Sequence, residues 1–161
     1  MAELIAGVGD IVISGNPDDQ LKTYALGSCV AVIMYAPALK VAALAHVALP
    51  DSSLAENKAS KKTGYFADTS IPEMIRLLKE FGIQNHQQVW VKLVGGANMM
   101  DSHGHFNIGK RNVLAVKKHL WKYRLGAIAE EVGGRISRTV SINVASGHIK
   151  IYSPRKVKRS L

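Results

Sequence analysis

The sequence predicts an α+β protein in which a largely antiparallel or mixed sheet is covered by two main helices. Short apolar runs of strand length dominate both ends of the 161-residue chain, and two segments between them have helical periodicity. We expect about seven or eight strands and two helices. They should form one domain over residues 1–161, a length that can bury a core without disulfides or metals.

The N-terminal half is expected to alternate strands and turns. A short strand at 11–13 lies between glycine-containing turns, and residues 30–35 (VAVIMY) and 40–49 (KVAALAHVAL) are continuous apolar runs. Runs of this kind are typical of strands buried on both faces. Ala36-Pro37 separates the two runs, which should pair as a hairpin.

The middle of the chain begins with residues 51–63, a polar segment without periodicity that is expected to be a flexible surface loop. A helix should follow, capped by Thr69 or Ser70, with Pro72 in its first turn and Gly82 as its stop. Apolar residues recur at helical spacing in this segment: Met74, Leu77, Leu78 and Phe81.

A second helix should begin at an Asn107 cap and extend to about Leu125, with Gly126 as its stop. Its core-facing stripe consists of Val113, Val116, Leu120 and Tyr123. A second ridge consists of Leu114, Trp121 and Leu125, among Lys117, Lys118 and Arg124. Such a ridge either packs under another element or docks an acidic amphipathic helix.

The remaining predicted elements are strands. Residues 89–94 should form a strand that ends at Gly95-Gly96, where the missing side chains let another backbone approach. Residues 139–144 and 148–152 surround a Ser-Gly pair, which favours a hairpin. No element is predicted for the basic tail, residues 153–161.

The formal net charge of +9 suggests an acidic partner: nucleic acid, an anionic membrane surface or an acidic protein. Aromatic residues make up only 6% and are not interleaved with basic residues, which argues against a base-stacking surface. No apolar run approaches the roughly 18 residues that span a bilayer, so no membrane insertion is expected. The N-terminus lacks the pattern of a secretory signal, which indicates a cytoplasmic protein.

Cys29 is the single cysteine, so no intramolecular disulfide forms. It follows Gly27-Ser28 and comes just before the apolar run at 30–35. A cysteine at the mouth of a strand, beside a tight Gly-Ser turn, can be presented as a nucleophile. Backbone N–H groups around Ser28 and Cys29 are then candidates for an oxyanion site. The alternative is an inert thiol buried in a turn.

His46 lies seventeen residues after Cys29 in an otherwise apolar run. An unpaired imidazole in a core costs about 1–3 kcal/mol, so His46 needs a partner. If the two apolar runs pair, His46 can lie beside Cys29 and act as its base. Thr23, six residues before Cys29, could orient the ring. The alternative is a core histidine whose hydrogen bonds are satisfied within the fold.

Metal and nucleotide sites are only weakly indicated. His103 and His105, with Asp101 and Cys29, could supply ligands, but a full site needs three or four in the right geometry. Gly95-Gly96 lacks the glycine spacing of phosphate-binding loops. No metal and no cofactor are therefore expected.

Five segments, in the family's order, resemble the chemoreceptor glutamine deamidases, the CheD family. They are LGSCVAV at 26–32, AHVALP at 45–50, GGANM at 95–99, NIGKRN at 107–112, and Gly133-Gly134 followed by Arg138. Together they cover nearly the whole chain, residues 7–152. Ala25 stands where the family usually has glycine.

The resemblance implies an α/β sandwich related to the toxin-like cysteine hydrolases, with Cys29, His46 and Thr23 as the catalytic set. It implies a protein-glutamine glutaminase that converts glutamines of methyl-accepting chemoreceptors to glutamate, with an accessory methylesterase activity on receptor glutamyl esters. It also implies a partner, the CheC-type CheY-phosphate phosphatase, which binds and inhibits the deamidase.

Two other functions stay open from the sequence. A deamidase scaffold could serve as a non-enzymatic regulator that binds the CheC-type phosphatase, although Cys29, His46 and Thr23 are all retained. Nucleic-acid binding is the third hypothesis, and a steep salt dependence of a DNA complex would support it. The retained catalytic set favours the enzyme.

Overall fold

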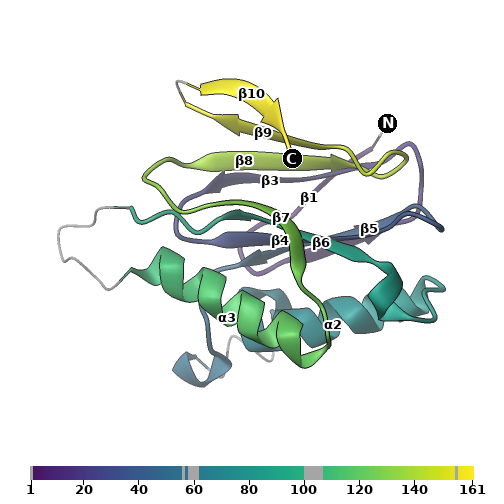
Figure 1. Ribbon diagram of the computed structural model, residues 1–161, viewed down its shortest axis with the longest axis horizontal. Coiled ribbons are helices and arrows are strands. Elements are labelled where there is room, and N and C mark those ends of the chain that lie inside the picture. Colours follow the sequence, from purple (N-terminus) through teal and green to yellow (C-terminus); the bar gives the residue numbers. More distant parts are fainter. Residues whose placement is uncertain (1, 56, 58–61, 100–106, 155) are drawn as a thin grey trace.

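The computed structural model describes residues 2–55, 57, 62–99, 107–154 and 156–161, and within them it contains two five-stranded sheets and two main helices. These elements form three layers: one sheet lies in the middle, the other sheet covers one of its faces, and both helices cover the opposite face (Figure 1). The α+β prediction is confirmed, with ten strands in place of the expected seven or eight.

The strands are β1 (Glu3–Ile5), β2 (Ile11–Ser14), β3 (Gln20–Leu26), β4 (Val30–Ala36), β5 (Val41–Val47), β6 (Trp90–Gly95), β7 (Ala127–Val132), β8 (Arg138–Asn143), β9 (Ile149–Ser153) and β10 (Lys156–Ser160). The helices are α2 (Ala67–Glu80) and α3 (Ile108–Lys122), and short 3-10 turns are η1 (Ser52–Leu54), η2 (Thr63–Tyr65) and η3 (His86–Gln88). Neither of the two described helices has the length and apolarity needed to cross a membrane.

The middle layer, which we call the helix-side sheet, has the strand order β2-β5-β4-β6-β7, and the outer sheet has the order β1-β3-β8-β9-β10. β4 and β5 pair antiparallel from Val30↔Val47 to Ala36↔Val41, and β8 pairs antiparallel with β9, so both predicted hairpins are confirmed. β6 pairs with the other side of β4. Neighbours on both sides therefore hold the strand that follows Cys29.

Two hydrophobic cores lie on either side of the helix-side sheet, one beneath the helices and one between the two sheets. Along β4, Val30 and Val32 face the helices, whereas Ala31 and Ile33 face the outer sheet. Every residue of β4 and β5 is buried, as predicted for strands covered on both faces. A polar side chain in β5 therefore needs a partner inside the fold.

Helix α2 begins at Ala67, earlier than predicted, with Phe66 at its N-cap. The N–H of Ser70 donates to the Phe66 carbonyl at 2.9 Å, so Ser70 is already inside the first turn and caps nothing. Thr69 also lies within the helix, and Pro72 is in the second turn rather than the first. The cap prediction for α2 is therefore wrong.

The predicted end of α2 is confirmed, because Gly82 takes the left-handed conformation with a φ of 101°. At the end of α3 the residue with the left-handed conformation is Arg124, with a φ of 57°. The helix therefore ends at Lys122 and not near Gly126. Asn107 occupies the N-cap of α3 as predicted. Its φ is 49°, however, and its side chain makes no capping hydrogen bond.

Helix α3 buries the predicted stripe, made of Val113, Val116 and Leu120, with Tyr123 packed beside them. The second ridge is only partly as predicted. Leu125 is buried, whereas Leu114 is 57% exposed and Trp121 is 79% exposed. The packing of Trp121 under another element is therefore excluded, and Leu125 does not belong to the exposed ridge.

The predicted flexible loop at 51–63 lies partly outside the described residues, which omit 56 and 58–61. Its first part is tied to α2. Ser52 donates from its backbone N–H and from its hydroxyl to the two carboxylate oxygens of Asp68, at 2.9 and 2.6 Å.

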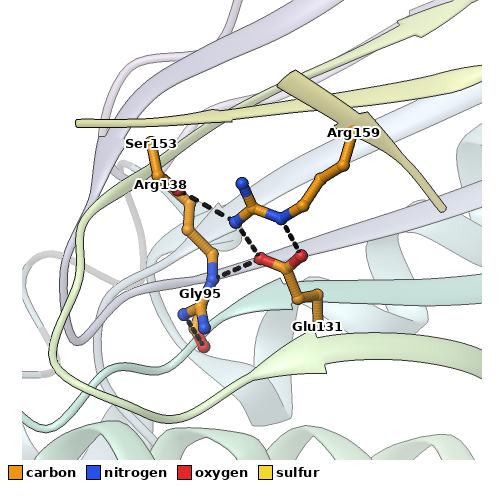
Figure 2. Close-up of polar contacts among 5 residues, drawn as sticks. All are labelled: Gly95, Glu131, Arg138, Ser153 and Arg159. Atoms are coloured by element: carbon orange, nitrogen blue, oxygen red, sulfur yellow. Dashed lines mark hydrogen bonds and ion pairs between the residues drawn. The ribbon is translucent and has the colours of Figure 1, made fainter. Parts of the chain in front are cut away.

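The basic tail, for which no element was expected, forms β10 and pairs with β9 at the edge of the outer sheet. Figure 2 shows how side chains hold it: Arg159 binds the carboxylate of Glu131 on β7, which also accepts from buried Arg138 at 2.7 Å. The Arg159 and Arg138 guanidinium groups lower the pKa of Glu131. Arg138, the first residue of β8, also donates to the Gly95 carbonyl at 3.2 Å, so the contacts that start at Arg159 reach the end of β6 through Glu131 and Arg138.

Basic and aromatic side chains of distant segments meet on the outer sheet. The ammonium of Lys22 lies 4.8 Å from the ring centre of Tyr24 and 5.8 Å from that of Tyr152. Lys158 lies 5.2 Å from the Tyr152 ring. The pairing of β3 with β8 and of β8 with β9 and β10 therefore gathers these lysine and tyrosine side chains on one sheet.

Candidate active site

The three predicted catalytic residues lie at one end of the space between the two sheets. Cys29 immediately precedes β4 and packs against the inter-sheet core while staying partly exposed. His46 on β5 is the register partner of Ala31, so His46 and Cys29 are diagonal neighbours on one face of the sheet. Thr23 faces them, fully buried, from β3 of the outer sheet.

A hydrogen bond joins Thr23 to His46, with Oγ1 and Nδ1 2.7 Å apart. The hydroxyl proton of Thr23 is used elsewhere, because Oγ1 donates to the Ala6 carbonyl at 2.6 Å. A hydroxyl has only one proton, so Oγ1 accepts from His46, and Nδ1 carries the hydrogen. A neutral imidazole then has an unprotonated Nε2. Thr23 thus selects the tautomer in which His46 can act as a base.

Burial shifts both ionisable groups of the site toward their neutral forms. Desolvation lowers the pKa of His46 below its ordinary value of 6.5, and the Asp10 carboxylate opposes that shift. Desolvation also raises the pKa of the Cys29 thiol above 9.0. At neutral pH the resting pair is therefore a thiol and an imidazole, and the thiol needs a base during attack.

The turn before β4, residues 27–29, is held through its carbonyl groups. The carbonyls of Gly27 and Cys29 accept hydrogen bonds of 2.9 and 2.8 Å from the backbone at the end of β6, and that of Ser28 accepts from the Asn112 side chain at 3.0 Å. The three N–H groups of the turn donate to none of the residues that the structure describes. Among the described residues these donors beside the thiol therefore have no acceptor, at the place where the oxyanion site is expected.

The close backbone approach predicted at Gly95-Gly96 is confirmed. A side chain on Gly95 would collide with the carbonyl oxygen of Cys29, and one on Gly96 would collide with Val113 of α3. Both glycines have positive φ, 115° and 61°. The end of β6 can therefore contact the turn at residues 27–29 and α3 at the same time.

Ala25 has a strained backbone conformation. Its φ is 54°, in the left-handed region, and the register between β3 and β8 shifts between Thr23 and Leu26. Its N–H donates to the hydroxyl of Thr139 at 3.1 Å, so the strand pairing holds this conformation. A residue with a side chain costs about 1–2 kcal/mol there.

Replacing Ala25 with glycine is therefore expected to stabilise the fold by about 0.5–1 kcal/mol, because relief of strain exceeds the entropy that glycine adds to the unfolded chain. The urea midpoint should rise with no change in slope. Ala38 is also exposed, but its φ lies outside the left-handed region, so Ala38→Gly should lower the midpoint. A lower midpoint for Ala25→Gly would contradict the strain argument.

The histidine pair considered as metal ligands, His103 and His105, lies outside the described residues together with Asp101. Across the ranges that the structure describes, no three His, Cys, Asp or Glu side chains form a group that could hold a metal ion. The described site thus consists of a thiol, an imidazole, a threonine hydroxyl and the backbone of the turn.

Two contributors to the site were not found from the sequence. The carbonyl of Ala6 is a backbone atom, which no residue type marks. Asn112 was noted only as the last residue of the NIGKRN segment, yet its side chain is fully buried against the turn at residues 27–29. One signal could have found it: Asn112 is a polar residue one helical turn before Val116, on the stripe that faces the core.

The site has the parts that a cysteine hydrolase requires: an imidazole of fixed tautomer lies on the same face of the sheet as a thiol, and the N–H groups of the thiol's turn donate to none of the described residues. The family model described as CheD chemotactic sensory transduction matches residues 48–153. On this match and the relatives below, the chain belongs to the CheD family, which confirms the resemblance.

Relatives of known name agree over nearly the full length. The chain is 47% identical to the probable chemoreceptor glutamine deamidase CheD of Syntrophotalea carbinolica, over 96% of both chains. It is 39% identical to the probable chemoreceptor glutamine deamidase CheD 1 of Syntrophus aciditrophicus, over 95% of both. It is 40% identical to the chemoreceptor glutamine deamidase CheD of Thermotoga maritima, over 91% of this chain and 89% of that one.

Proposed function

We propose that this chain, acting as one domain, is a chemoreceptor glutamine deamidase that converts receptor glutamine side chains to glutamate. Its relatives carry that name over nearly the whole chain. The observation that carries the chemistry is the contact between Thr23 and His46, which leaves Nε2 free to act as a base beside the single cysteine. A cytoplasmic location suits this chemistry, because a reducing compartment keeps Cys29 as a thiol.

The reaction proceeds in two acyl-transfer steps. His46 Nε2 takes the proton of Cys29 as Sγ attacks the amide carbon of the glutamine side chain. Backbone N–H groups at Ser28 and Cys29 stabilise the oxyanion. The imidazolium then protonates the departing nitrogen, ammonia leaves, and a thioester forms. Water, deprotonated by His46, attacks the thioester, and the proton returns to Sγ as glutamate is released.

The same site can also hydrolyse glutamyl methyl esters of the receptor. Attack of Sγ on the ester carbon gives the same thioester, and His46 protonates methanol in place of ammonia. We include this methylesterase activity in the proposal because both reactions share the acyl half of the substrate.

Mass spectrometry of a receptor co-expressed with this chain tests the proposal directly. Conversion of glutamine to glutamate at defined receptor positions is the expected result, and it should be insensitive to chelators because no step uses a metal. Unchanged receptor glutamines would refute the deamidase. Activity lost with a chelator and restored with zinc would instead assign the chemistry to a metal site.

A CheC-type CheY-phosphate phosphatase is the proposed protein partner, on the strength of the family resemblance alone. If the chain were only a regulator of that phosphatase, the tautomer selection at His46 would serve no purpose. The enzyme is therefore the favoured hypothesis.

A receptor helix is the proposed occupant of the exposed surface on α3, made of Leu114 and Trp121. A groove of about 570 Å³ lies at its C-terminal end, lined by Trp121, Lys122, Arg124, Leu125 and Gly126. The cationic side chains at this end of α3 are exposed: Lys118, Lys122 and Arg124. An apolar anchor with a basic rim is complementary to an acidic amphipathic helix.

Trp121→Ala should raise the KM for the receptor about tenfold, the loss expected for an aromatic anchor, without changing kcat. The melting temperature should stay within a degree or so of the wild type, because Trp121 is 79% exposed. Leu39→Ala is the control, since Leu39 is another exposed large apolar residue, at 50%, but lies in the turn between β4 and β5. An unchanged KM for Trp121→Ala would show that the receptor does not bind this surface. Weaker binding of the CheC-type phosphatase by the same variant would then identify the phosphatase as the occupant.

A further inference from the structure

The NIGKRN segment has no role in the proposed mechanism, yet its last residue contacts the site. Asn112 lies in the first part of α3 and is fully buried. Its side-chain amide donates two hydrogen bonds, one to the Ser28 carbonyl at 3.0 Å and one to the Ala48 carbonyl at 2.9 Å. Ser28 directly precedes Cys29, and Ala48 comes two residues after His46. One amide thus connects the turn of the nucleophile with the strand of the base.

These two bonds begin where the ladder between β4 and β5 ends. The last paired residues are Val30 and Val47, and beyond them the two strands present carbonyls that cannot bond each other. A primary amide supplies two N–H donors from one nitrogen, which is what two adjacent acceptors require. A hydroxyl has one donor and an apolar side chain has none. The Asn112 amide therefore replaces the backbone hydrogen bonds that a further residue pair between β4 and β5 would make.

The bond to Ser28 also determines where the N–H of Cys29 points. The peptide bond between them is trans, so the Ser28 carbonyl and the Cys29 N–H point in opposite directions. Because the carbonyl is directed at Asn112 on α3, the N–H is directed away from α3. The thiol and the imidazole lie on that same face of the sheet, opposite the helices. Asn112 therefore aims a proposed oxyanion donor.

The oxygen of the Asn112 side chain differs from its nitrogen in its hydrogen bonding. Asn112 Oδ1 is buried and has no partner among the described residues. An unsatisfied buried acceptor costs about 1–3 kcal/mol. Among the described residues, the hydrogen bonds of the Asn112 amide therefore go only to the two carbonyls of the site.

We propose that Asn112 is a positioning residue of the deamidase, which fixes the Ser28–Cys29 peptide plane for the oxyanion and holds the end of β5 beside the nucleophile. The inference rests on the proposed function and names a further residue on which the same reaction depends. A merely structural role for Asn112 would change stability alone, whereas positioning changes kcat and the reactivity of Cys29.

The test uses Asn112→Asp, which keeps the shape of the side chain but can bond at most one carbonyl, and only when protonated. It should lower kcat about 100-fold, the loss expected when one oxyanion donor is misdirected, with KM within about threefold. Alkylation of Cys29 by iodoacetamide at neutral pH should fall toward the rate of the His46→Ala variant. The readout is unambiguous because Cys29 is the only cysteine.

Val116→Ala is the matched control, because Val116 is also fully buried one turn further along α3 and packs in the core beneath the helices. It should lose stability but keep kcat within about threefold. Asn112→Ala, assayed below its own melting temperature, carries the test if Asn112→Asp does not fold.

Wild-type kcat and alkylation in a folded Asn112 variant would overturn the inference, as would losses no greater than those of Val116→Ala. Failure of the proposed function gives a different pattern. Wild-type protein would then leave receptor glutamines unchanged, while the alkylation comparison would still measure whether Asn112 positions Cys29.

Discussion

Replacing Cys29 with alanine is expected to abolish receptor deamidation while leaving the fold intact. The thiol forms the acyl intermediate, so its removal should lower kcat about 10⁴-fold or more. The structural loss is small, because Cys29 is partly exposed and lies outside the regular pairing of β4. Mass spectrometry of the co-expressed receptor measures the activity, and thermal unfolding of the purified variant measures the fold.

Two further observations separate loss of the nucleophile from loss of structure. Iodoacetamide should inactivate the wild-type protein in proportion to the alkylation of its single cysteine. Cys29→Ser should fold normally and stay nearly inactive, because a serine hydroxyl in this site is a much weaker nucleophile. Conversion at the wild-type rate by a folded Cys29→Ala protein would refute the enzyme.

The placement of Cys29 and His46 at the same end of the helix-side sheet could be predicted because both residues adjoin a single local hairpin. The two apolar runs are separated only by the short turn after Ala36, so counting along an antiparallel pair places the two side chains at the same end. An imidazole in an apolar strand also required a partner. Thr23 could be proposed from its closeness in sequence, but its tautomer selection depends on the Ala6 carbonyl.

Asn112 could not be assigned in the same way, because its contacts depend on how α3 docks on the sheet. Its two acceptors are 84 and 64 residues away in the sequence. Helical periodicity places Asn112 on the core side of α3, but it does not say which loop that side meets. The position follows only when Gly109 of α3 packs against the backbone at Gly96 and Ala97.

The other errors have local causes. Arg124 takes a left-handed conformation that normally signals glycine or asparagine, so the true end of α3 has no sequence marker. The tail appears in the sequence as a solvated basic segment. It forms a strand that pairs with β9, and Glu131, on the other sheet, supplies the carboxylate that Arg159 binds. In both places a tertiary contact overrides the local pattern.

Replacing His46 with alanine should cost nearly as much as losing Cys29, about 10⁴-fold in kcat, because the two side chains act as a unit. The raised pKa of the thiol makes this dependence stronger, since little thiolate forms without a base. Thr23→Ala should cost less, because it removes only the hydroxyl that fixes the ring. Thr23→Ser, which keeps that hydroxyl, should recover most of the activity.

The pH profile tests the same base in the unmodified protein. Burial disfavours the imidazolium, so His46 is neutral and active above its lowered pKa, and kcat/KM should fall as the pH decreases through that value. The midpoint of this acid limb should therefore lie below 6.5, the ordinary value for histidine. Asp10 opposes the shift, so Asp10→Asn should move the midpoint to still lower pH. An acid limb centred above 6.5, or one that Asp10→Asn moves upward, would mean that His46 is not the group that accepts the thiol proton.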